Sequence, residues 1–531
     1  MKRLHENQNW EDIDLKKPVR SLSIRVYRNT VSWLLIAIFG GALGACTAAS
    51  AQNPGGGPGN SSAQSSQSGS SSQGGSSNSG ASYGGNGNSA SSILSQSPYS
   101  GSVPEGKATS EVIPLSFKDA IDRALRNNLG ILLESDNTLA ARGQKWHELS
   151  ALLPHLNATA TQSAEQIDLA ALGFRFSFPG IPNVVGPLGI WQAQVNVSQT
   201  IFDFNAIERT RGASANLEAA HLLYKDARDM VVLAAGNAYL ETLAEAARVE
   251  TAQAQVTTAQ AVYDRSVDQQ KAGVSPAIDA LRARVELQSQ QQQLIVAKNN
   301  YAKQKLTLAR TIGLPPGQDF SLTDKAPYEP LAAMGVEQAL QRAYASRSDY
   351  MAAAQQVRSA EYLRRAATAE HYPSLGIGGY YGDAGIRPGS SHGVFQAGVT
   401  LDIPITAGGK THGDVLQAEA SLRQARQQLE NLRGQIDLEV RTALLDLASA
   451  AEQVEVARST IDLANQTLTQ SQDRFTAGVT DNLEVVQAQE SVTSANENYI
   501  SSLYAHNLAK VELARAIGFA EQGVRLYLQG K

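Results

Sequence analysis

The sequence predicts a mainly α-helical chain with a membrane β-barrel, built from a duplicated unit of helix, strand, strand and helix. The first observation behind this fold class is a constant offset of 205 residues, which relates Gly273 to Gly478 and Gly313 to Gly518. The second is one clearly amphipathic strand in each copy, followed by a long segment free of proline. Matching segments in the same order indicate one structural unit that occurs twice.

Residues 1–51 are predicted to be a signal sequence. Basic residues precede an apolar run at 31–45, and the small residues Ala49, Ser50 and Ala51 follow it. This order is typical of secretion signals, and the run is shorter than the roughly 20 apolar residues of a membrane-spanning helix. An uncleaved membrane anchor is the alternative that the pattern leaves open.

Cys46 is the only cysteine of the chain, so no disulfide framework can form within it. It ends the segment Leu43-Gly44-Ala45-Cys46, which resembles the lipobox of bacterial lipoproteins, and Cys46 is therefore a candidate for lipidation. The unusually long basic region before it favours ordinary cleavage after Ala51 instead. Cys46 is thus either the acylated N-terminus of the mature chain or a residue removed with the signal sequence.

Composition excludes several function classes. The formal net charge is −5 and the basic N-terminal segment is part of that sum, so the remaining chain is mildly acidic and offers no basic face to nucleic acid. The eight histidines show no metal-binding spacing, and Gly409-Lys410-Thr411 lacks the earlier glycine of a phosphate-binding loop. We therefore expect no enzyme activity, no catalytic residues, no cofactor and no metal.

The segment after the signal sequence is predicted to be a disordered tether. Nearly all of residues 52–103 are Gly, Ser, Asn, Gln or Ala, and such a segment cannot bury enough apolar surface to fold. Order is expected to begin near Ile113, where Ser116 and Asp119 have the spacing of a capping box and start the first helix. The predicted domains are the signal sequence 1–51, the tether 52–112, the first repeat 113–328, the second repeat 329–520 and a C-terminal tail 521–531.

Each repeat is predicted to contain two strands, the second of which alternates between apolar and polar residues. The first strands, near 156–161 and 375–381, alternate less cleanly. The apolar positions of the second strands are Trp191, Ala193, Val195, Val197 and Ile201 in one repeat, and Phe395, Ala397, Val399, Leu401, Ile403 and Ile405 in the other. A period of two places these residues on one face of each strand, and we expect that face to meet lipid while the polar face lines a wet lumen.

The number of strands predicts an oligomer. A bacterial membrane barrel needs at least about eight strands, and open sheet edges are not tolerated in lipid. Four strands from one chain cannot satisfy both conditions, so the strands must come from several chains. Three chains would supply a 12-stranded β-barrel with four strands per chain.

Each second strand leads into a long alanine-rich helix and a return helix. Residues 206–271 would form a helix of roughly 100 Å, and residues 276–313 one of roughly 57 Å. The helix at 129–153 adds roughly 37 Å, so the two shorter helices end to end would match the long one. Gly273 and Gly478 stand where the long helices reverse, which is a usual place for a glycine cap. One such pair buries too little surface to be stable alone, so lateral neighbours are required.

Several short motifs recur in the order typical of one known family. They are Leu152-Leu153-Pro154, Tyr372-Pro373, Leu401-Asp402-Ile403-Pro404-Ile405, Gly408-Gly409 and the two Ala-Gly-Val tips. Over residues 113–520 the chain resembles the TolC family of outer-membrane efflux proteins. The resemblance implies a homotrimer in the outer membrane of a Gram-negative bacterium, with one shared barrel in the lipid and a long α-helical barrel crossing the periplasm.

The resemblance also implies a function and partners. It implies a passive exit duct for efflux of small molecules, which works with a periplasmic membrane-fusion adaptor and an inner-membrane transporter. Type I secretion of proteins or peptides is an alternative. A surface coiled-coil adhesin or structural stalk is an alternative of another class, although an adhesin would carry its strands at one end, whereas here strand pairs interrupt the helices twice.

By the same resemblance, the helix reversals are contact tips for the adaptor, and polar residues just beyond them are candidates for a periplasmic gate. The tips are Ala272, Gly273, Val274 and Ser275 in the first repeat and Ala477, Gly478, Val479 and Thr480 in the second. The gate candidates are Asp279, Arg282, Asp481, Glu484 and Gln487. Some family members hold an arginine and an aspartate where this sequence has Thr480 and Gln487, so a gate built from that pair is not expected here. The plainer interpretation makes all of them turn and surface residues.

Overall fold

The computed structural model describes only part of the chain. The described residues are 97–168, 171, 184–324, 328–331, 334–480, 482–521 and 523. All of them belong to the compact unit Gly85–Lys531. The predicted signal sequence, Cys46, most of the predicted tether, Asp481 and most of the predicted tail lie outside the described residues, and the expectations placed on them stay predictions.

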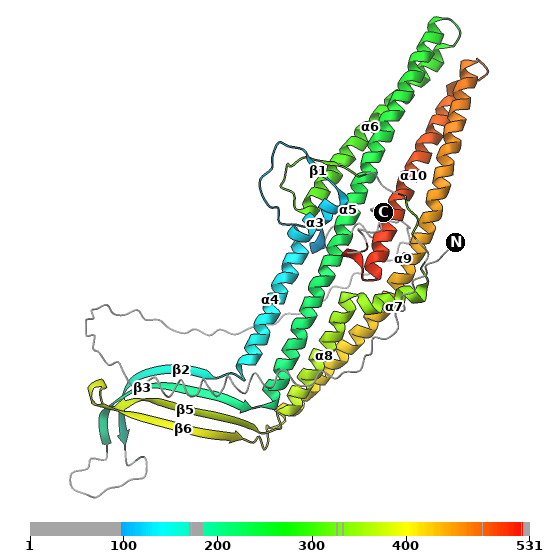
Figure 1. Ribbon diagram of the computed structural model, residues 1–531. Coiled ribbons are helices and arrows are strands. Elements are labelled where there is room, and N and C mark those ends of the chain that lie inside the picture. Colours follow the sequence, from blue (N-terminus) through cyan, green and yellow to red (C-terminus); the bar gives the residue numbers. More distant parts are fainter. Residues whose placement is uncertain are drawn as a thin grey trace, which may run out of the picture. The chain divides into compact units, whose positions relative to one another are not determined.

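Two long helical hairpins dominate the fold, one in each repeat (Figure 1). The first consists of α5 (Phe204–Lys271) and α6 (Ala277–Ile312), and the second of α9 (Lys410–Thr476) and α10 (Asn482–Ala516). The partners of each hairpin pack along one another and meet at a short turn. Their bounds agree closely with the helices expected from the proline-free segments.

Shorter helices precede the strands in each repeat. They are α3 (Phe117–Asn127) and α4 (Leu129–Ser150) in the first repeat, and α7 (Val336–Ser346) and α8 (Ser348–Ala369) in the second. Helices α4 and α6 pack against α5, whereas α8 and α10 pack against both α5 and α9. The described helices therefore form one layer, with α4 and α6 at one edge and α9 at the other. This arrangement confirms that two shorter helices flank each long one.

One extended residue breaks the shorter helices at the same place in each repeat. Asn128 separates α3 from α4 with φ −69° and ψ 133°, and Arg347 separates α7 from α8 with φ −65° and ψ 120°. At both places the returning helix, α6 or α10, ends in a left-handed glycine, Gly313 or Gly518. We call the region around these breaks the joint of each repeat.

The ordered body begins earlier than the sequence predicts. The capping box of Ser116 and Asp119 is present as expected, but residues 97–112 also make specific contacts. The Asn128 side chain donates to the Tyr99 carbonyl at 2.5 Å, and the Thr109 amide donates to Gln318 at 2.7 Å. The strap 97–112 includes a short 3₁₀ turn, η1 (Pro98–Ser100), and leads into β1 (Ile113–Leu115), which pairs in parallel with β4 (Phe320–Leu322). The polar composition of this segment suggested a tether up to residue 112 and gave no indication of these contacts.

The two predicted strand pairs join into one antiparallel sheet. Its order is β2 (His155–Asp168), β3 (Val184–Phe202), β5 (Ser374–Gly385) and β6 (Ser391–Asp402), with a 3₁₀ turn η2 (Pro388–Ser390) between the last two. The hairpins of the two repeats meet through β3 and β5, so β2 and β6 are the edges. Strand β6 ends at Asp402, so Ile403 and Ile405 lie beyond the strand to which the alternation assigned them. Pro404 has no backbone N–H to continue a ladder.

The buried core is concentrated at the joints. One cluster includes Tyr239 and Val231 of α5, Leu308 and Ile312 of α6, and Val511 of α10. A second cluster joins Ile436 and Val440 of α9 to Leu513 and Ile517 near the end of α10. No described helix combines the length and the apolar composition needed to cross a membrane.

Candidate functional site

The two hairpin turns have the same geometry. Gly273 and Gly478 both have φ 72°, the left-handed conformation that glycine adopts most readily. The amides of Val274 and Val479 donate to the carbonyls of Gln269 and Arg474, at 2.9 and 3.0 Å, which closes each helix end. The turns at Gly273 and Gly478 therefore correspond to each other in structure as well as in sequence, and the duplication includes the hydrogen bond that closes each turn.

Both tips present a small apolar surface. Val274 is 76% exposed and Val479 is 69% exposed, although valine is usually buried. Apart from the glycine and the residues next to it in the chain, no heavy atom lies within 4 Å of a Cβ added at either position. Each tip therefore offers an exposed valine and an unobstructed backbone, as expected of a contact surface.

The gate candidates of the first repeat bind within their own hairpin. Asp279 is buried, and one of its carboxylate oxygens accepts a hydrogen bond from the Ser275 hydroxyl at 2.6 Å. Arg282 lies 3.9 Å from the same carboxylate and keeps much of its side chain in solvent. Asp279 lies in the first turn of α6, where an acid is favoured by the unpaired amides of the helix start.

Glu484 has the corresponding place at the start of α10. Its carboxylate accepts from Thr480 at 2.5 Å, from Arg474 at 3.0 Å and from Ser471 at 3.4 Å. Gln487 is exposed one turn further on. The structure thus brings Thr480 and Glu484 together and leaves Gln487 apart from them, while Asp481 is outside the described residues. A gate role for any of these residues remains a prediction.

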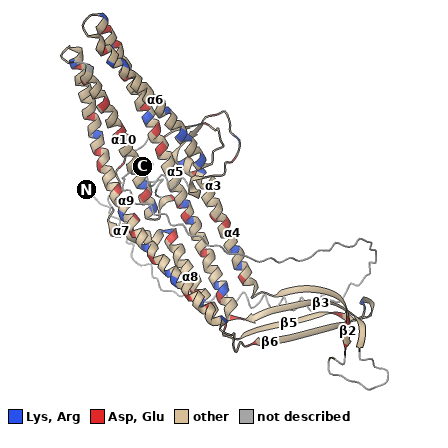
Figure 2. Cartoon of the chain, turned by 180° about the vertical axis from the view of Figure 1, so that it is seen from behind, with Lys and Arg blue, Asp and Glu red and all other residues tan. Residues whose placement is uncertain are grey.

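The faces of the sheet differ in chemistry as the alternation predicts. Val195 lies opposite Ala158 of β2 and Tyr381 of β5, and Tyr381 lies opposite Phe395 of β6. Directly opposed residues of antiparallel strands share a face, so one apolar face continues over all four strands. Phe395 is 79% exposed and Val399 is 70% exposed. Figure 2 shows few charged residues on these strands and many along the helices.

The edges of the helical layer are also apolar and exposed. On α9 these residues lie 7 or 11 positions apart, which places them on one line along the helix: Leu438, Leu445, Val456 and Leu463. On α4, Leu132, Leu139 and Trp146 form a similar line. We call these the α9 stripe and the α4 stripe. They lie on opposite edges of the layer, so they cannot cover each other within one chain.

The joint of the second repeat contains a buried ionic network that sequence reasoning missed. The Arg347 guanidinium is 2% exposed and donates to Asp349 at 2.6 Å and to Glu439 at 2.5 Å. Arg515 of α10 donates to Asp226 of α5 at 2.5 Å. The network therefore links α5, α8, α9 and α10. The only signal in the sequence was the position of Arg347, which corresponds to the neutral break residue Asn128 of the first repeat.

Burial and charge act against each other in this network. Burial raises the pKa of Asp226 to about 6 despite the attraction of Arg515. Burial acts in the same direction on Asp349, but the hydrogen bonds and charge of Arg347 prevail and hold the pKa of that carboxyl below its usual value. The difference follows from the forked contact that Arg347 makes with Asp349, since two parallel hydrogen bonds stabilise a carboxylate strongly.

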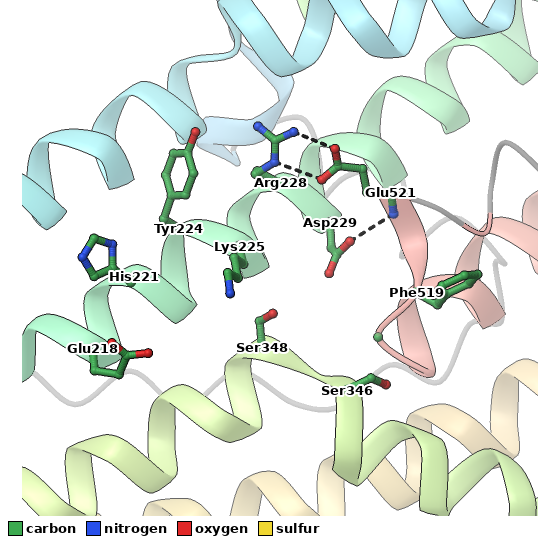
Figure 3. A pocket seen from close by; sticks show the side chains of 11 residues that line it. Glu218, His221, Tyr224, Lys225, Arg228, Asp229, Ser346, Ser348, Phe519 and Glu521 are labelled. Carbon is green, nitrogen blue, oxygen red and sulfur yellow. Dashed lines mark hydrogen bonds and ion pairs between the residues drawn. The ribbon is translucent and has the colours of Figure 1, made fainter. Parts of the chain in front are cut away.

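A cavity of about 760 Å³ lies beside this network (Figure 3). Arg228 of α5 spans it to Glu521 with two hydrogen bonds of 2.9 and 2.6 Å, and the Glu521 amide donates to Asp229 at 3.1 Å. Ser346 and Ser348 face it from the break between α7 and α8. These contacts fasten the residues after α10 to the long helix of the other repeat. Both acidic and basic side chains line the cavity.

The described residues contain no group of three or more metal-ligating side chains. The distinctive features of the described region are two matched tips, an amphipathic sheet and a helical layer with two open apolar edges.

Comparison with known proteins defines the class. The profile of the family described as "Outer membrane efflux protein" matches residues 120–314 and 339–519, which follow the two repeats. The chain belongs to this family. It is thus an outer-membrane efflux channel of a Gram-negative bacterium, and proteins of this family are transport channels rather than enzymes.

Individual relatives agree with this assignment. The chain is 22% identical to the outer membrane protein TolC of Vibrio cholerae, over 79% of this chain and 94% of that protein. It is 21% identical to the alkaline protease secretion protein AprF of Pseudomonas aeruginosa, over 76% and 86%. Its fold matches the crystal structure of the outer membrane protein VceC of Vibrio cholerae with a TM-score of 0.65 at 19% identity, over 76% of this chain and 96% of that one.

Proposed function

We propose that three copies of this chain form a single exit duct, which carries small molecules out of the cell together with a periplasmic adaptor and an inner-membrane transporter. The observation that carries the proposal is that both layers of the chain have two open edges. Among the described strands, β2 and β6 each lack a partner on one side, and α4 and α9 carry exposed apolar stripes on opposite edges.

The two edges of each layer lie on opposite sides of the chain and are formed by different elements, β2 and β6 in the sheet and α4 and α9 in the helical layer. An edge of one copy can therefore meet the other edge of the next copy, which is a head-to-tail assembly. Such an interface generates a ring when the rotation between copies closes. In that ring β6 of one copy would pair with β2 of the next, which removes edges that lipid does not tolerate. Three copies would close a 12-stranded barrel, with the apolar face toward lipid and the Gln, Asn and Thr face toward the lumen. The helical layers would close in the same way into a tunnel.

The tips are the proposed contact with the adaptor. They lie at the ends of hairpins of roughly 100 Å and expose Val274 and Val479 beside glycines with open space around them. Small and apolar residues let another backbone approach closely. Asp279, Arg282, Asp481, Glu484 and Gln487 are the proposed gate residues just inside the tips.

Substitution at one tip tests this function. Gly478→Leu should leave the amount of trimer unchanged but abolish export in the native host, because it adds bulk at a left-handed turn that a partner must approach. Gly317→Leu is the matched control. Gly317 also has a positive φ, of 87°, and open space where a Cβ would lie, but it is outside the tips. Survival of export in Gly478→Leu, or equal loss in both variants, would contradict the tip assignment.

Type I secretion is the second candidate function. It is favoured by the similarity to AprF, whose name describes secretion of a protease. Accumulation of a secreted protein inside cells that lack this chain, with unchanged sensitivity to small toxic compounds, would favour secretion. The opposite pattern would favour efflux.

A further inference from the structure

A second cavity, of about 410 Å³, lies among the four long helices between the joints and the tips. Its walls are formed by α5 between residues 250 and 258, by Gln290 of α6, by α9 between 465 and 468, and by α10 between 489 and 496. The volume is in the range of pockets that hold small molecules. Most of the lining side chains are amides and hydroxyls, so a ligand in this cavity would be held mainly by hydrogen bonds.

Two glutamines of this cavity have a buried side-chain oxygen without a donor. Gln290 is 4% exposed and Gln489 is 8% exposed, and no described residue donates to the Oε1 atom of either. The Gln290 Nε2 donates to the Glu286 carboxylate at 2.7 Å. This contact fixes the orientation of the amide, because a carboxylate accepts and does not donate. A buried oxygen without a donor destabilises the fold, so a ligand that donates to these atoms would be bound favourably.

The other polar groups of the cavity also offer acceptors. The hydroxyls of Thr258 and Thr493 donate to backbone carbonyls of their own helices, at 3.1 and 3.0 Å. The Asn496 Nδ2 donates to a carbonyl of its own helix at 3.0 Å. The donors of these side chains are therefore used within the helices, whereas their oxygens keep free lone pairs. A ligand that matches this arrangement must supply the donors itself.

The charge of the cavity has one sign. Glu250 is the single charged side chain among the described residues that line it. Arg248 is close in sequence but is bound to Glu497 and to Glu245, each at 2.9 Å. The cavity thus combines several acceptors with a carboxylate and has no cation among its described lining residues.

We infer that this cavity binds a small organic cation with several N–H donors, such as a primary diamine or a related polyamine. One ammonium group has three donors, which is enough to satisfy the oxygens of both Gln290 and Gln489. A second ammonium group would be attracted to Glu250. Hydrogen bonds from a charged donor are stronger than those between neutral groups, so a diamine is favoured over an uncharged alcohol of the same length.

Calorimetric titration of the purified full-length protein with 1,4-diaminobutane tests this site. We expect saturable binding of one ligand per chain. Gln489→Met keeps the length of the side chain but removes the oxygen, and it should weaken binding about tenfold or more, because a hydrogen bond from a charged donor is lost. Glu250→Gln should also weaken binding. The uncharged analogue 1,4-butanediol should bind about tenfold more weakly than the diamine, or not at all.

Gln291→Met is the matched control, since Gln291 is the exposed neighbour of Gln290 and does not line the cavity. This variant should bind the diamine as the wild-type protein does. Absent or non-saturable binding, equal binding of the diol, or equal loss in Gln291→Met and Gln489→Met would overturn the inference.

Thermal unfolding without ligand separates the loss of a binding group from structural damage. Gln489→Met should unfold at the same temperature as the wild-type protein or at a higher one, because it removes a buried oxygen that has no donor. Unfolding at a lower temperature would show that the oxygen has a partner within the protein, which contradicts the inference. None of these measurements requires transport, so the binding site and the proposed duct stand or fall separately.

Discussion

Lys510 of α10 is fully buried, and its Nζ makes no hydrogen bond to any described residue. Burial lowers the pKa of this amine, against a weaker attraction from Glu329. His506, one turn earlier, is also buried, and burial likewise lowers the pKa of its imidazole. A buried cationic group without a partner costs several kcal/mol in general, so Lys510 reduces the stability of the chain.

Replacing Lys510 by methionine should therefore stabilise the protein. At pH 7 we expect Lys510→Met to raise the free energy of unfolding by about 1–3 kcal/mol, measured by thermal denaturation. Because the folded pKa lies below the unfolded value, the wild-type protein gains stability as pH rises through that interval, and the advantage of the variant should shrink near pH 10. Lys298→Met, at an exposed position of α6, serves as control and should change little. A less stable Lys510→Met variant would show that the amine has a favourable partner.

The elements show where sequence reasoning succeeds. Period-two alternation around Val195 and Val399 predicted the strands, and the glycine pair Gly273 and Gly478 predicted the reversals, because both signals are local. Even the start of α5 at Phe204 has a local cause, since the Asp203 side chain accepts from the amides of Asn205 and Ala206. The boundaries of the hairpins followed from such signals.

Other features depend on contacts between distant segments. Tyr504 and Asn237 are 267 residues apart, and nothing near either residue indicates that their helices meet at that level. Alanine-rich helices have small side chains on all sides and can pack on a neighbour in many rotations about their own axis. Their sequence therefore does not indicate which face meets the neighbour. The helix break at Arg347 and the strap before Ile113 were missed for the same reason, because each is held by residues far along the chain. The start of α4 at Leu129 was predicted, and its cap is local, since the Asn128 side chain accepts from the Gly130 amide.

The sheet gives a test of its two faces at adjacent positions. Val399 lies opposite Ile377 on the apolar face, whereas Thr400 lies opposite Gly376 on the polar face. Val399→Arg should cost about 2–4 kcal/mol of stability if the residue meets lipid near the bilayer midplane. Thr400→Arg should cost much less and alter conductance instead. Equal loss of heat-resistant trimer on a gel in the two variants would contradict the assignment of faces.

At the scale of the whole molecule, the α9 stripe is expected to be an interface between copies. Leu445→Arg should weaken the trimer by about 2–4 kcal/mol per interface, because it places a charge against an apolar surface. A gel run after heating to a series of temperatures would show dissociation at a lower temperature. Asp462→Arg is the control, since this exposed residue lies about a third of a turn from the line of the stripe. An unchanged Leu445→Arg trimer would place the contact elsewhere.

Three residues of α5 that contact α10, Asp226, Asn237 and Arg248, are 11 residues apart, and this spacing has a consequence for the length of the duct. Each interval of 11 residues on α5 advances the helix by roughly 16 Å and returns a side chain to nearly the same direction. Inserting or deleting 11 residues would leave every side chain beyond that point on nearly the same side of the helix. The neighbouring helices would have to lengthen or shorten by the same distance along the axis. An insertion of one or two residues would instead turn the whole outer part of the helix away from its partners. The span of such a channel can therefore grow or shrink only in discrete steps.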